Sequence, residues 1–231
     1  MKCSFVLIVS VLYGLIFELI YQKQHITIEN EQLKNENLQT RYNMLANQIS
    51  PHFLFNSLNS LSMLVREKSN DKALLYIDRL ADTFRYMLQS GQGELTTLSE
   101  ELRFTEAYLY LLTIRYENKL FCDIRIEDRY RDWKLPVLSL QPLIENAVKH
   151  NSISRTKPLR IAIRTDDGTL VVSNPLIPKI DETTGTGIGL KNLSSRYLLL
   201  TSQQVRIIRT DDAFEVILPL IEAPNPIKSL S

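Results

Sequence analysis

Three segments of the chain combine residue types that could carry out phosphoryl chemistry. The segment 48–59 holds a lone histidine, His52, among apolar residues, with Asn56 close behind it. The segment 140–151 holds a cluster of Asn, Glu, Lys and His, and the segment 185–190 is a glycine loop. Each signal is weak alone, but in this order they predict a nucleophile followed by a nucleotide pocket.

His52 is the candidate nucleophile. A neutral imidazole nitrogen is nucleophilic near neutral pH, and the phosphoramidate that it forms can pass its phosphoryl group to a carboxylate. Phe53, Leu54 and Leu58 can fill the interior of a helical bundle while His52 projects to solvent from another face. Asn56 follows one helical turn later, where it can hydrogen-bond or orient the ring. A structural histidine is the alternative interpretation.

The cluster at 140–151 suits magnesium and phosphate. Asn146, Lys149 and His150 are three and four residues apart, so all three can face one side of a helix. An Asn carbonyl oxygen suits Mg²⁺, which prefers oxygen ligands and keeps several waters when it is shared with phosphates. Lys149 can meet phosphate oxygens as a point charge. A polar surface patch is the alternative, and the apolar residues that flank the cluster disfavour it.

Gly185, Gly187, Gly189 and Leu190 join a loop to the start of a helix. Glycines let the backbone approach phosphates closely, and the first amides of a helix favour anions. The segment lacks the Lys-Ser/Thr pair of a Walker P-loop. It therefore predicts a phosphate contact of another kind, with a simple turn as the alternative.

The three segments resemble those of the LytS/YehU-type sensor histidine kinases, over about residues 33–220. The resemblance implies a phospho-acceptor segment followed by an ATP-binding domain of the gyrase/Hsp90/histidine-kinase type. It implies that His52 receives the γ-phosphoryl group of Mg-ATP and passes it to an aspartate of a response regulator, often one with a LytTR-type DNA-binding domain.

The resemblance also assigns roles within the nucleotide site. Asn146 is the implied magnesium ligand, and Glu145 is implied to polarise or orient the attacking group. His150 and Asn151 belong to the same ATP-binding segment, and the glycine segment closes the lid over ATP.

Two positions depart from the pattern of related kinases. Many of them carry an acid directly after the histidine, where this chain has Phe53, so the base that takes the ring proton is not identified. Related ATP-binding domains place an aspartate before the lid to accept from the adenine amino group, where this chain has Asn174. Its neutral carbonyl oxygen could accept the same bond. A degenerate kinase that acts as a nucleotide-binding scaffold and an ATPase without phosphorelay are the alternatives.

The N-terminal part predicts attachment to a membrane. The apolar run 3–21 is long enough to cross the hydrocarbon core as a helix, so we expect a transmembrane anchor over 1–22. A cleaved signal peptide and a buried helix are the alternatives. The heptad-like residues that follow predict a helical stalk over 23–48. The expected location is the bacterial cytoplasmic membrane, with a single span and a cytoplasmic catalytic part.

The segment 49–91 predicts a two-helix hairpin. One helix runs through Pro51, which should kink it, to about Arg66, and a second runs from Lys72 to about Ser90. The second helix carries an apolar stripe: Leu74, Leu75, Ile77, Leu80, Ala81, Phe84 and Met87. A hairpin with so much apolar surface predicts pairing with a second copy into a four-helix bundle, and hence a homodimer.

The segment 92–222 predicts an α+β domain with one mixed sheet and helices on one face. We expect helices at 98–116 (capped by Ser99), 136–151 and 188–200, strands at 121–127, 159–165, 169–174, 205–209 and 214–218, and a frayed tail at 223–231. The net charge of +1, from 27 basic and 26 acidic residues, gives no case for direct nucleic-acid binding. Cys3 and Cys122 form no disulfide framework, which fits a reducing compartment.

Overall fold

The computed structural model describes residues 22–23, 51–89, 95–177 and 188–222. The predicted anchor and stalk, the domain boundary at 91–93 and the tail lie outside these residues, except for Gln22 and Lys23, which are helical. Among the described residues, no helix is long and apolar enough to cross a membrane. The chain divides into two compact units, Met1–Ile49 and Ser50–Ser231, and the second contains everything described below.

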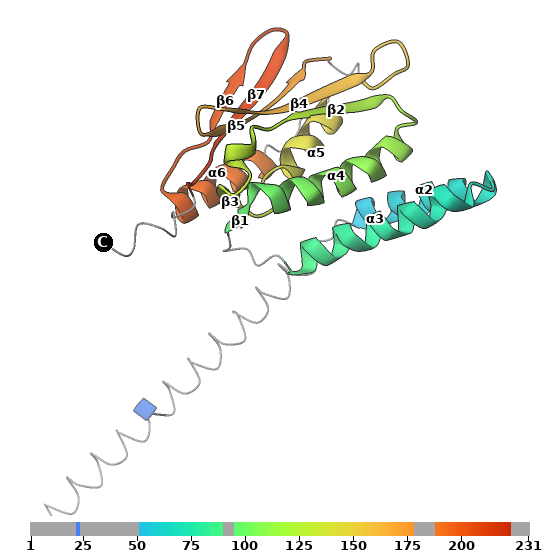
Figure 1. Cartoon of the computed structure of the whole chain (residues 1–231), viewed down its shortest axis with the longest axis horizontal. Helices are drawn as coiled ribbons and strands as arrows, with labels where there is room; N and C mark the ends of the chain where they lie inside the picture. Colours follow the sequence, from blue (N-terminus) through green and yellow to red (C-terminus); the bar gives the residue numbers. More distant parts are fainter. Residues whose placement is uncertain (1–21, 24–50, 90–94, 178–187, 223–231) are drawn as a thin grey trace, which may run out of the picture. The chain divides into compact units, whose positions relative to one another are not determined.

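The predicted hairpin is present (Figure 1). Helix α2 covers Pro51–Arg66 and helix α3 covers Asn70–Gln89. The second helix begins two residues earlier than predicted, because the Ala73 amide already donates to the Ser69 carbonyl at 2.9 Å and closes the first helical turn. The predicted kink at Pro51 lies at the edge of the described residues.

Helix α4 covers Leu98–Arg115 and begins with a capping box. The Thr97 hydroxyl accepts from the Glu100 amide at 3.2 Å, and the Glu100 carboxylate accepts from the Thr97 amide at 3.3 Å. The prediction that Ser99 caps this helix was therefore wrong by two residues. The Thr97 hydroxyl and the Glu100 carboxylate thus accept from two amides at the start of the helix that have no partner within it.

The C-terminal domain contains a five-stranded mixed sheet, in which the strands are ordered β2-β4-β5-β7-β6. Its strands are β2 (Leu120–Arg125), β4 (Leu159–Asp166), β5 (Thr169–Pro175), β6 (Arg206–Arg209) and β7 (Ala213–Pro219). Strands β2 and β4 are parallel, and the other neighbours are antiparallel. Both predicted hairpins are confirmed. The β4–β5 turn uses Asp167 at φ 39° and Gly168 at φ 72°, as a tight hairpin turn requires.

The entry to the helix that carries the Asn motif differs from prediction. Helix α5 covers Gln141–His150 and begins five residues after Pro136, which instead ends a short strand, β3 (Lys134–Pro136), paired with β1 (Leu95–Thr97). Leu138 has a φ of 55°, which no continuous right-handed helix permits. Helix α6 covers Ile188–Thr201, within one residue of the predicted helix.

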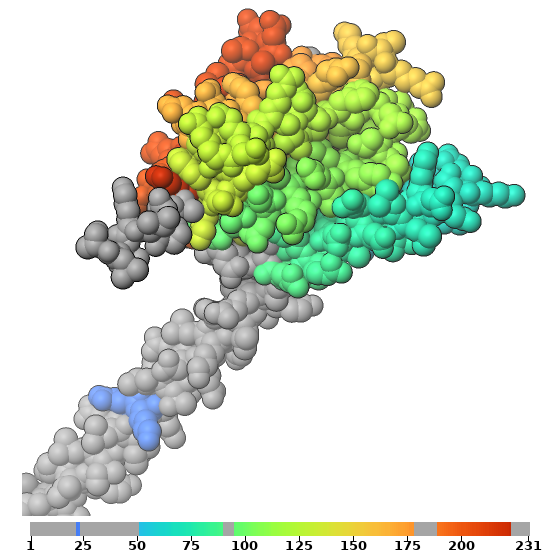
Figure 2. All heavy atoms as spheres, viewed as in Figure 1, coloured from blue at the N-terminus to red at the C-terminus, as the bar shows by residue number. Residues whose placement is uncertain are grey.

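Helix α4 is buried on more than one side. Its buried residues lie around most of its circumference: Leu98, Glu101, Leu102, Phe104, Thr105, Ala107, Tyr108, Leu109, Leu111 and Leu112. A helix without a single apolar face is covered by more than one neighbour. Helix α4 contacts the α2–α3 hairpin and also strand β2, so it lies between the hairpin and the sheet (Figure 1 and Figure 2).

Candidate functional site

His52 is exposed in the first turn of α2, as its predicted role requires. The next residue, Phe53, is 8% exposed. Its ring centroid lies 6.0 Å from that of Phe84 and 5.3 Å from that of Tyr108 in α4. Phe53 thus packs against the C-terminal domain of the same chain. The sequence had instead predicted that Phe53 fills the interior of a helical bundle.

Asn56 lies one turn after His52 and is half-buried. Its Nδ2 atom is inaccessible to solvent and has no hydrogen-bond partner among the described residues. A buried donor without a partner costs about 1–3 kcal/mol. This donor therefore makes no hydrogen bond to the His52 ring, and the role of Asn56 beside His52 stays a prediction.

Helix α5 presents the predicted magnesium and phosphate residues. Leu143, Ile144 and Ala147 anchor its inner face in the core. Asn146 is half-buried on the side of this apolar face, and Lys149 and His150 are exposed at the end of the helix. One amide oxygen and one ammonium group close together are suited to a magnesium-bound phosphate chain.

Glu145, the neighbour of Asn146, faces helix α4. Its Oε1 atom accepts from the Tyr108 hydroxyl at 3.0 Å and from Gln141 Nε2 at 2.9 Å. Successive residues of an α-helix project about 100° apart, so this contact turns Asn146 away from Tyr108. The structure therefore places Glu145 beside the predicted site and gives its carboxylate two donors from the protein itself.

Tyr108 was not predicted from the sequence, and it links two of the predicted segments. Its ring is 2% exposed and contacts Phe53, while its hydroxyl reaches Glu145. Burial and the nearby Glu145 carboxylate raise the pKa of Tyr108 well above its ordinary value, so the hydroxyl stays protonated and donates. The sequence signal for this contact was an aromatic pair, Phe104 and Tyr108, four residues apart on one helix.

Asn151 ends α5 and is 1% exposed. Its Nδ2 donates to the Ala147 carbonyl at 2.8 Å, and its Oδ1 accepts from the Ile177 amide at 2.6 Å. The Ser152 amide also donates to the Ile177 carbonyl, at 2.8 Å. Asn151 thus ties the end of α5 to Ile177, in the segment that follows β5.

Asn174 lies near the end of β5 and is 6% exposed. Its Nδ2 donates to the Pro175 carbonyl at 2.8 Å. This bond orients the side-chain amide, so that Oδ1 is the atom left to accept from a ligand. The geometry is therefore compatible with the predicted contact to an adenine amino group.

The glycine segment is described only in part. Gly185 and Gly187 lie outside the described residues. Gly189 is exposed in the first turn of α6, and a Cβ atom there would meet nothing within 4 Å. Packing of the described residues therefore does not require a glycine at this position. Leu190, the next residue, is half-buried against the core.

The donor set fits a magnesium nucleotide better than a metal held by the protein alone. Across the described ranges, no group of three or more His, Cys, Asp or Glu side chains could hold a metal ion. A magnesium ion at Asn146 would therefore take most of its ligands from phosphate and water, as is usual for Mg²⁺.

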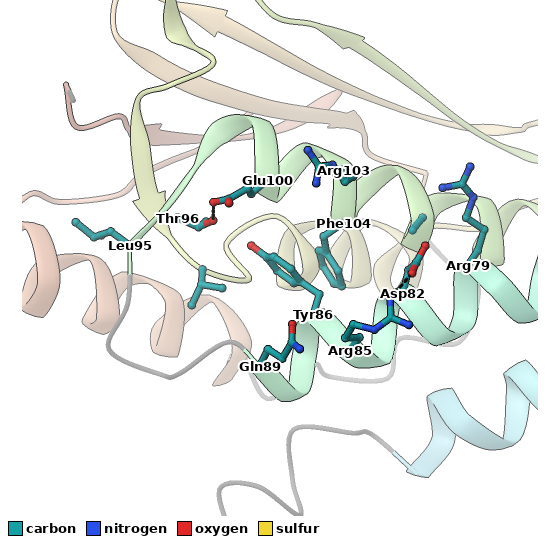
Figure 3. A pocket seen from close by; sticks show the side chains of 12 residues that line it. Arg79, Asp82, Arg85, Tyr86, Gln89, Leu95, Thr96, Glu100, Arg103 and Phe104 are labelled. Carbon is teal, nitrogen blue, oxygen red and sulfur yellow. Dashed lines mark hydrogen bonds and ion pairs between the residues drawn. The ribbon is translucent and has the colours of Figure 1, made fainter. Parts of the chain in front are cut away.

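A separate cleft of about 490 Å³ opens between α3 and α4 (Figure 3). Its lining includes Arg79, Arg85, Tyr86, Arg103 and Phe104, and none of the predicted nucleotide-site residues. The cleft thus marks the junction between hairpin and domain, and it lies apart from the Asn146 cluster.

Comparisons of sequence support the assignment made from the motifs. A family model described as histidine kinase matches residues 40–120. The sensor histidine kinase/phosphatase LytS of Staphylococcus aureus strain Mu50 is 35% identical over 64% of this chain, and the same values hold for strain N315. The match covers 28% of the length of LytS, so this chain corresponds to a part of that relative. The predicted resemblance to sensor histidine kinases is confirmed.

Solved structures of histidine kinases are more distant. The catalytic domain of ThkA is 16% identical, with a TM-score of 0.38, over 55% of this chain and 94% of that domain. The cytoplasmic segment of QseC is 15% identical, with a TM-score of 0.42, over 66% of this chain and 95% of that segment.

Proposed function

We propose that this chain, which is similar to the sensor histidine kinases, is the phospho-accepting and ATP-binding part of a two-component kinase. His52 is the proposed acceptor, with Asn56 beside it. The proposed nucleotide site consists of Asn146 as magnesium ligand, with Glu145, Lys149, His150, Asn174 and the glycine segment. Asn151 is assigned the positioning of the segment at Ile177, because both ends of its amide are bonded to the protein.

The proposed reaction is a phosphoryl transfer from ATP to histidine. A ring nitrogen of His52 forms a bond to the γ-phosphorus, the bond from that phosphorus to the β,γ-bridging oxygen breaks, and ADP leaves. The residue directly after His52 is Phe53, which cannot accept a proton. The ring proton therefore passes to solvent or to a base elsewhere. Bound magnesium neutralises charge on the phosphates. An aspartate of a response regulator then takes the phosphoryl group as the nitrogen–phosphorus bond breaks.

An indirect link between two of the predicted segments, through Tyr108 of α4, carries this proposal. Phe53, next to the exposed His52, packs on Tyr108, and Tyr108 is bonded to Glu145, next to Asn146. These contacts connect the start of α2, where His52 lies, with the helix that carries Asn146. Incubation with Mg-ATP labelled at the γ-phosphate tests the proposal, and acid-labile label on the protein is the expected result. Release of phosphate without label would indicate an ATPase, and nucleotide binding without turnover would indicate a scaffold.

The hairpin has a second apolar face that the domain does not cover. Its exposed residues are Phe55, Leu58 and Val65 in α2, and Leu74, Leu75, Ile77 and Leu88 in α3. Leu74 alone is 63% exposed. Large exposed apolar patches mark interaction sites, so we propose that a second copy covers this face in a homodimer of four helices.

The homodimer predicts a concentration-dependent oligomer that depends on this face. A fragment beginning near Glu31 should sediment as a dimer at micromolar concentration, and one beginning near Glu94 as a monomer. Leu74→Lys should weaken the dimer by roughly tenfold or more, because it places a charge in an apolar interface. Leu199→Lys, at an 83% exposed position of α6, is the matched control and should leave the dimer intact. A monomeric longer fragment would contradict the bundle.

Membrane attachment and the partner belong to the same proposal. The apolar run at 3–21 supports a single-span anchor in the bacterial cytoplasmic membrane, with the kinase part in the cytoplasm. The proposed partner is a response regulator, and the family resemblance favours one of the LytTR type. The near-zero net charge supports no direct contact of this chain with nucleic acid.

Asn174 gives a prediction about adenine recognition. If Oδ1 accepts from the adenine amino group, Asn174→Leu should weaken ATP binding by roughly 1–3 kcal/mol, because a donor is left without a partner. Asn174→Asp should keep or tighten binding, because a charged acceptor bonds more strongly. Titration of ATP against each variant measures this. Ser173→Ala, on the opposite face of the same strand, is the control. Equal affinity for wild type and Asn174→Leu would mean that adenine is recognised elsewhere.

A further inference from the structure

Glu101 is a carboxylate buried at the centre of the domain, and the proposed reaction gives it no role. It is 0% exposed in the first turn of α4. Burying a charge is costly unless its oxygens are well hydrogen-bonded. The partners of Glu101 therefore indicate what the carboxylate does.

Donors from two other parts of the chain converge on it. Oε2 accepts from the Tyr86 hydroxyl and from the Leu138 amide, both at 2.9 Å, and Oε1 accepts from the Leu140 amide at 3.0 Å. Arg196 of α6 is close enough for its charge to act on Glu101, and its Nη2 donates to the Leu138 carbonyl at 3.0 Å. Burial raises the pKa of Glu101, and the three hydrogen bonds and the charge of Arg196 oppose that rise. Because every direct partner donates, the ionised form of the carboxylate satisfies all of them.

The two amides belong to the entry of the helix that carries Asn146. Leu140 occupies the cap position of α5, which has no side-chain cap of its own. Leu138, two residues earlier, adopts a φ of 55°, which is unfavourable for leucine and needs support from its surroundings. Glu101 supplies both the missing acceptor and a negative charge near the helix N-terminus. Glu101 therefore holds both amides at the entry of α5.

The third donor to Glu101, the Tyr86 hydroxyl, belongs to the hairpin that carries His52. Tyr86 of α3 stacks on Phe104 of α4, with ring centroids 4.6 Å apart and 20° between the planes. Figure 3 shows these two side chains next to each other in the wall of the cleft between the helices. Burial and the Glu101 carboxylate raise the pKa of Tyr86, so its hydroxyl stays protonated as a donor. Loss of the docked hairpin would remove one of the three donors of Glu101.

We propose that Glu101 is a positioning residue that couples docking of the α2–α3 hairpin, through Tyr86, to the start of α5. The coupling to nucleotide rests on the proposed function, whereas the coupling between Tyr86 and the α5 entry does not. Because linkage is reciprocal, a ligand that holds α5 in place also favours the docked hairpin.

Amide hydrogen exchange in the 231-residue chain tests the coupling without any activity. Glu101→Gln should speed exchange of the Leu138 and Leu140 amides by on the order of tenfold, the effect of losing one hydrogen bond to a charged group. Tyr86→Phe does not touch these amides, yet it should speed their exchange by about threefold or more through Glu101. The double variant should exchange no faster than Glu101→Gln, because both changes act through one carboxylate.

Tyr76→Phe is the matched control. Tyr76 is a buried tyrosine of the same helix, and its hydroxyl lies next to Ser57 and Ser60 of α2. The change loosens the hairpin internally without reaching Glu101, so exchange at Leu138 and Leu140 should stay as in wild type. An equal effect of Tyr76→Phe and Tyr86→Phe, no effect of Tyr86→Phe, or additive effects in the double variant would each overturn the proposal. If Glu101→Gln fails to fold, the two tyrosine variants still decide.

Mg-ATP provides the second readout. In wild type it should slow exchange in residues 84–89 of α3, and Glu101→Gln should remove that protection while Tyr76→Phe retains it. Protection at α5 without any at α3 would overturn the coupling to nucleotide. If Mg-ATP protects no part of the wild-type chain, the proposed nucleotide site fails, and the exchange of the unliganded variants still decides the role of Glu101.

Discussion

His52→Gln should reduce acid-labile phosphoprotein to background while ATP binding stays unchanged. Glutamine keeps the polarity and much of the size of the side chain but has no nucleophilic ring nitrogen. His52 is exposed, and no described partner depends on it for packing, so the fold should be retained. Labelling with Mg-ATP and a parallel ATP titration measure the two quantities separately.

The chain provides its own control for this substitution. It has three histidines, and His25 lies in the predicted stalk, far from the proposed site in sequence. His25→Gln should label as wild type does. Persistent acid-labile label in His52→Gln would reject His52 as the acceptor, and loss of label together with loss of ATP binding would indicate damage to the domain.

Asn146→Ala should lower magnesium-dependent labelling by on the order of 100-fold or more, because the metal supplies several kcal/mol of transition-state stabilisation. Asn146 is half-buried at the side of the apolar face of α5, so its removal leaves the core residues Leu143, Ile144 and Ala147 in place. The rate of label incorporation at a series of Mg²⁺ concentrations measures the effect.

A mixed dimer separates the roles of the two residues. The Asn146→Ala chain keeps His52, and the His52→Gln chain keeps the nucleotide site. Neither should label alone, and in the mixture the Asn146→Ala chain should become labelled by its partner. Normal labelling of Asn146→Ala by itself would show that the magnesium assignment is wrong.

Local sequence patterns predicted most of the elements. The β4–β5 hairpin follows from alternating apolar residues around Asp167-Gly168, which adopt the positive φ values of a tight turn. Helix α6 was predicted from the glycine segment before it and from the helical spacing of its apolar residues. The two hairpin helices were likewise predicted from the spacing of their apolar residues. The order of the chemical motifs likewise predicted the resemblance to histidine kinases, because each motif is contiguous in sequence.

Contacts between distant residues account for what the sequence did not predict. Pro136 is a common first residue of a helix, but β3 pairs it with Leu95, and Glu101 binds the amides of Leu138 and Leu140. The start of α5 is therefore set by a side chain 37 residues away from Leu138, which no local pattern contains. The cap of α4 was misplaced for a smaller reason, since Ser99 and Thr97 are both good caps and only the geometry selects Thr97.

The sequence by itself determined the reactive residue types, their order and the helices and strands that carry them, because these depend on neighbours along the chain. Only the tertiary structure decided which face of the hairpin packs on α4. The burial of Phe53 against Tyr108, and of Tyr86 against Phe104 and Glu101, leaves Leu74, Leu75 and Ile77 exposed. Both faces of the hairpin are apolar in sequence. The choice between them depends on aromatic and carboxylate partners that the folded domain alone brings within reach.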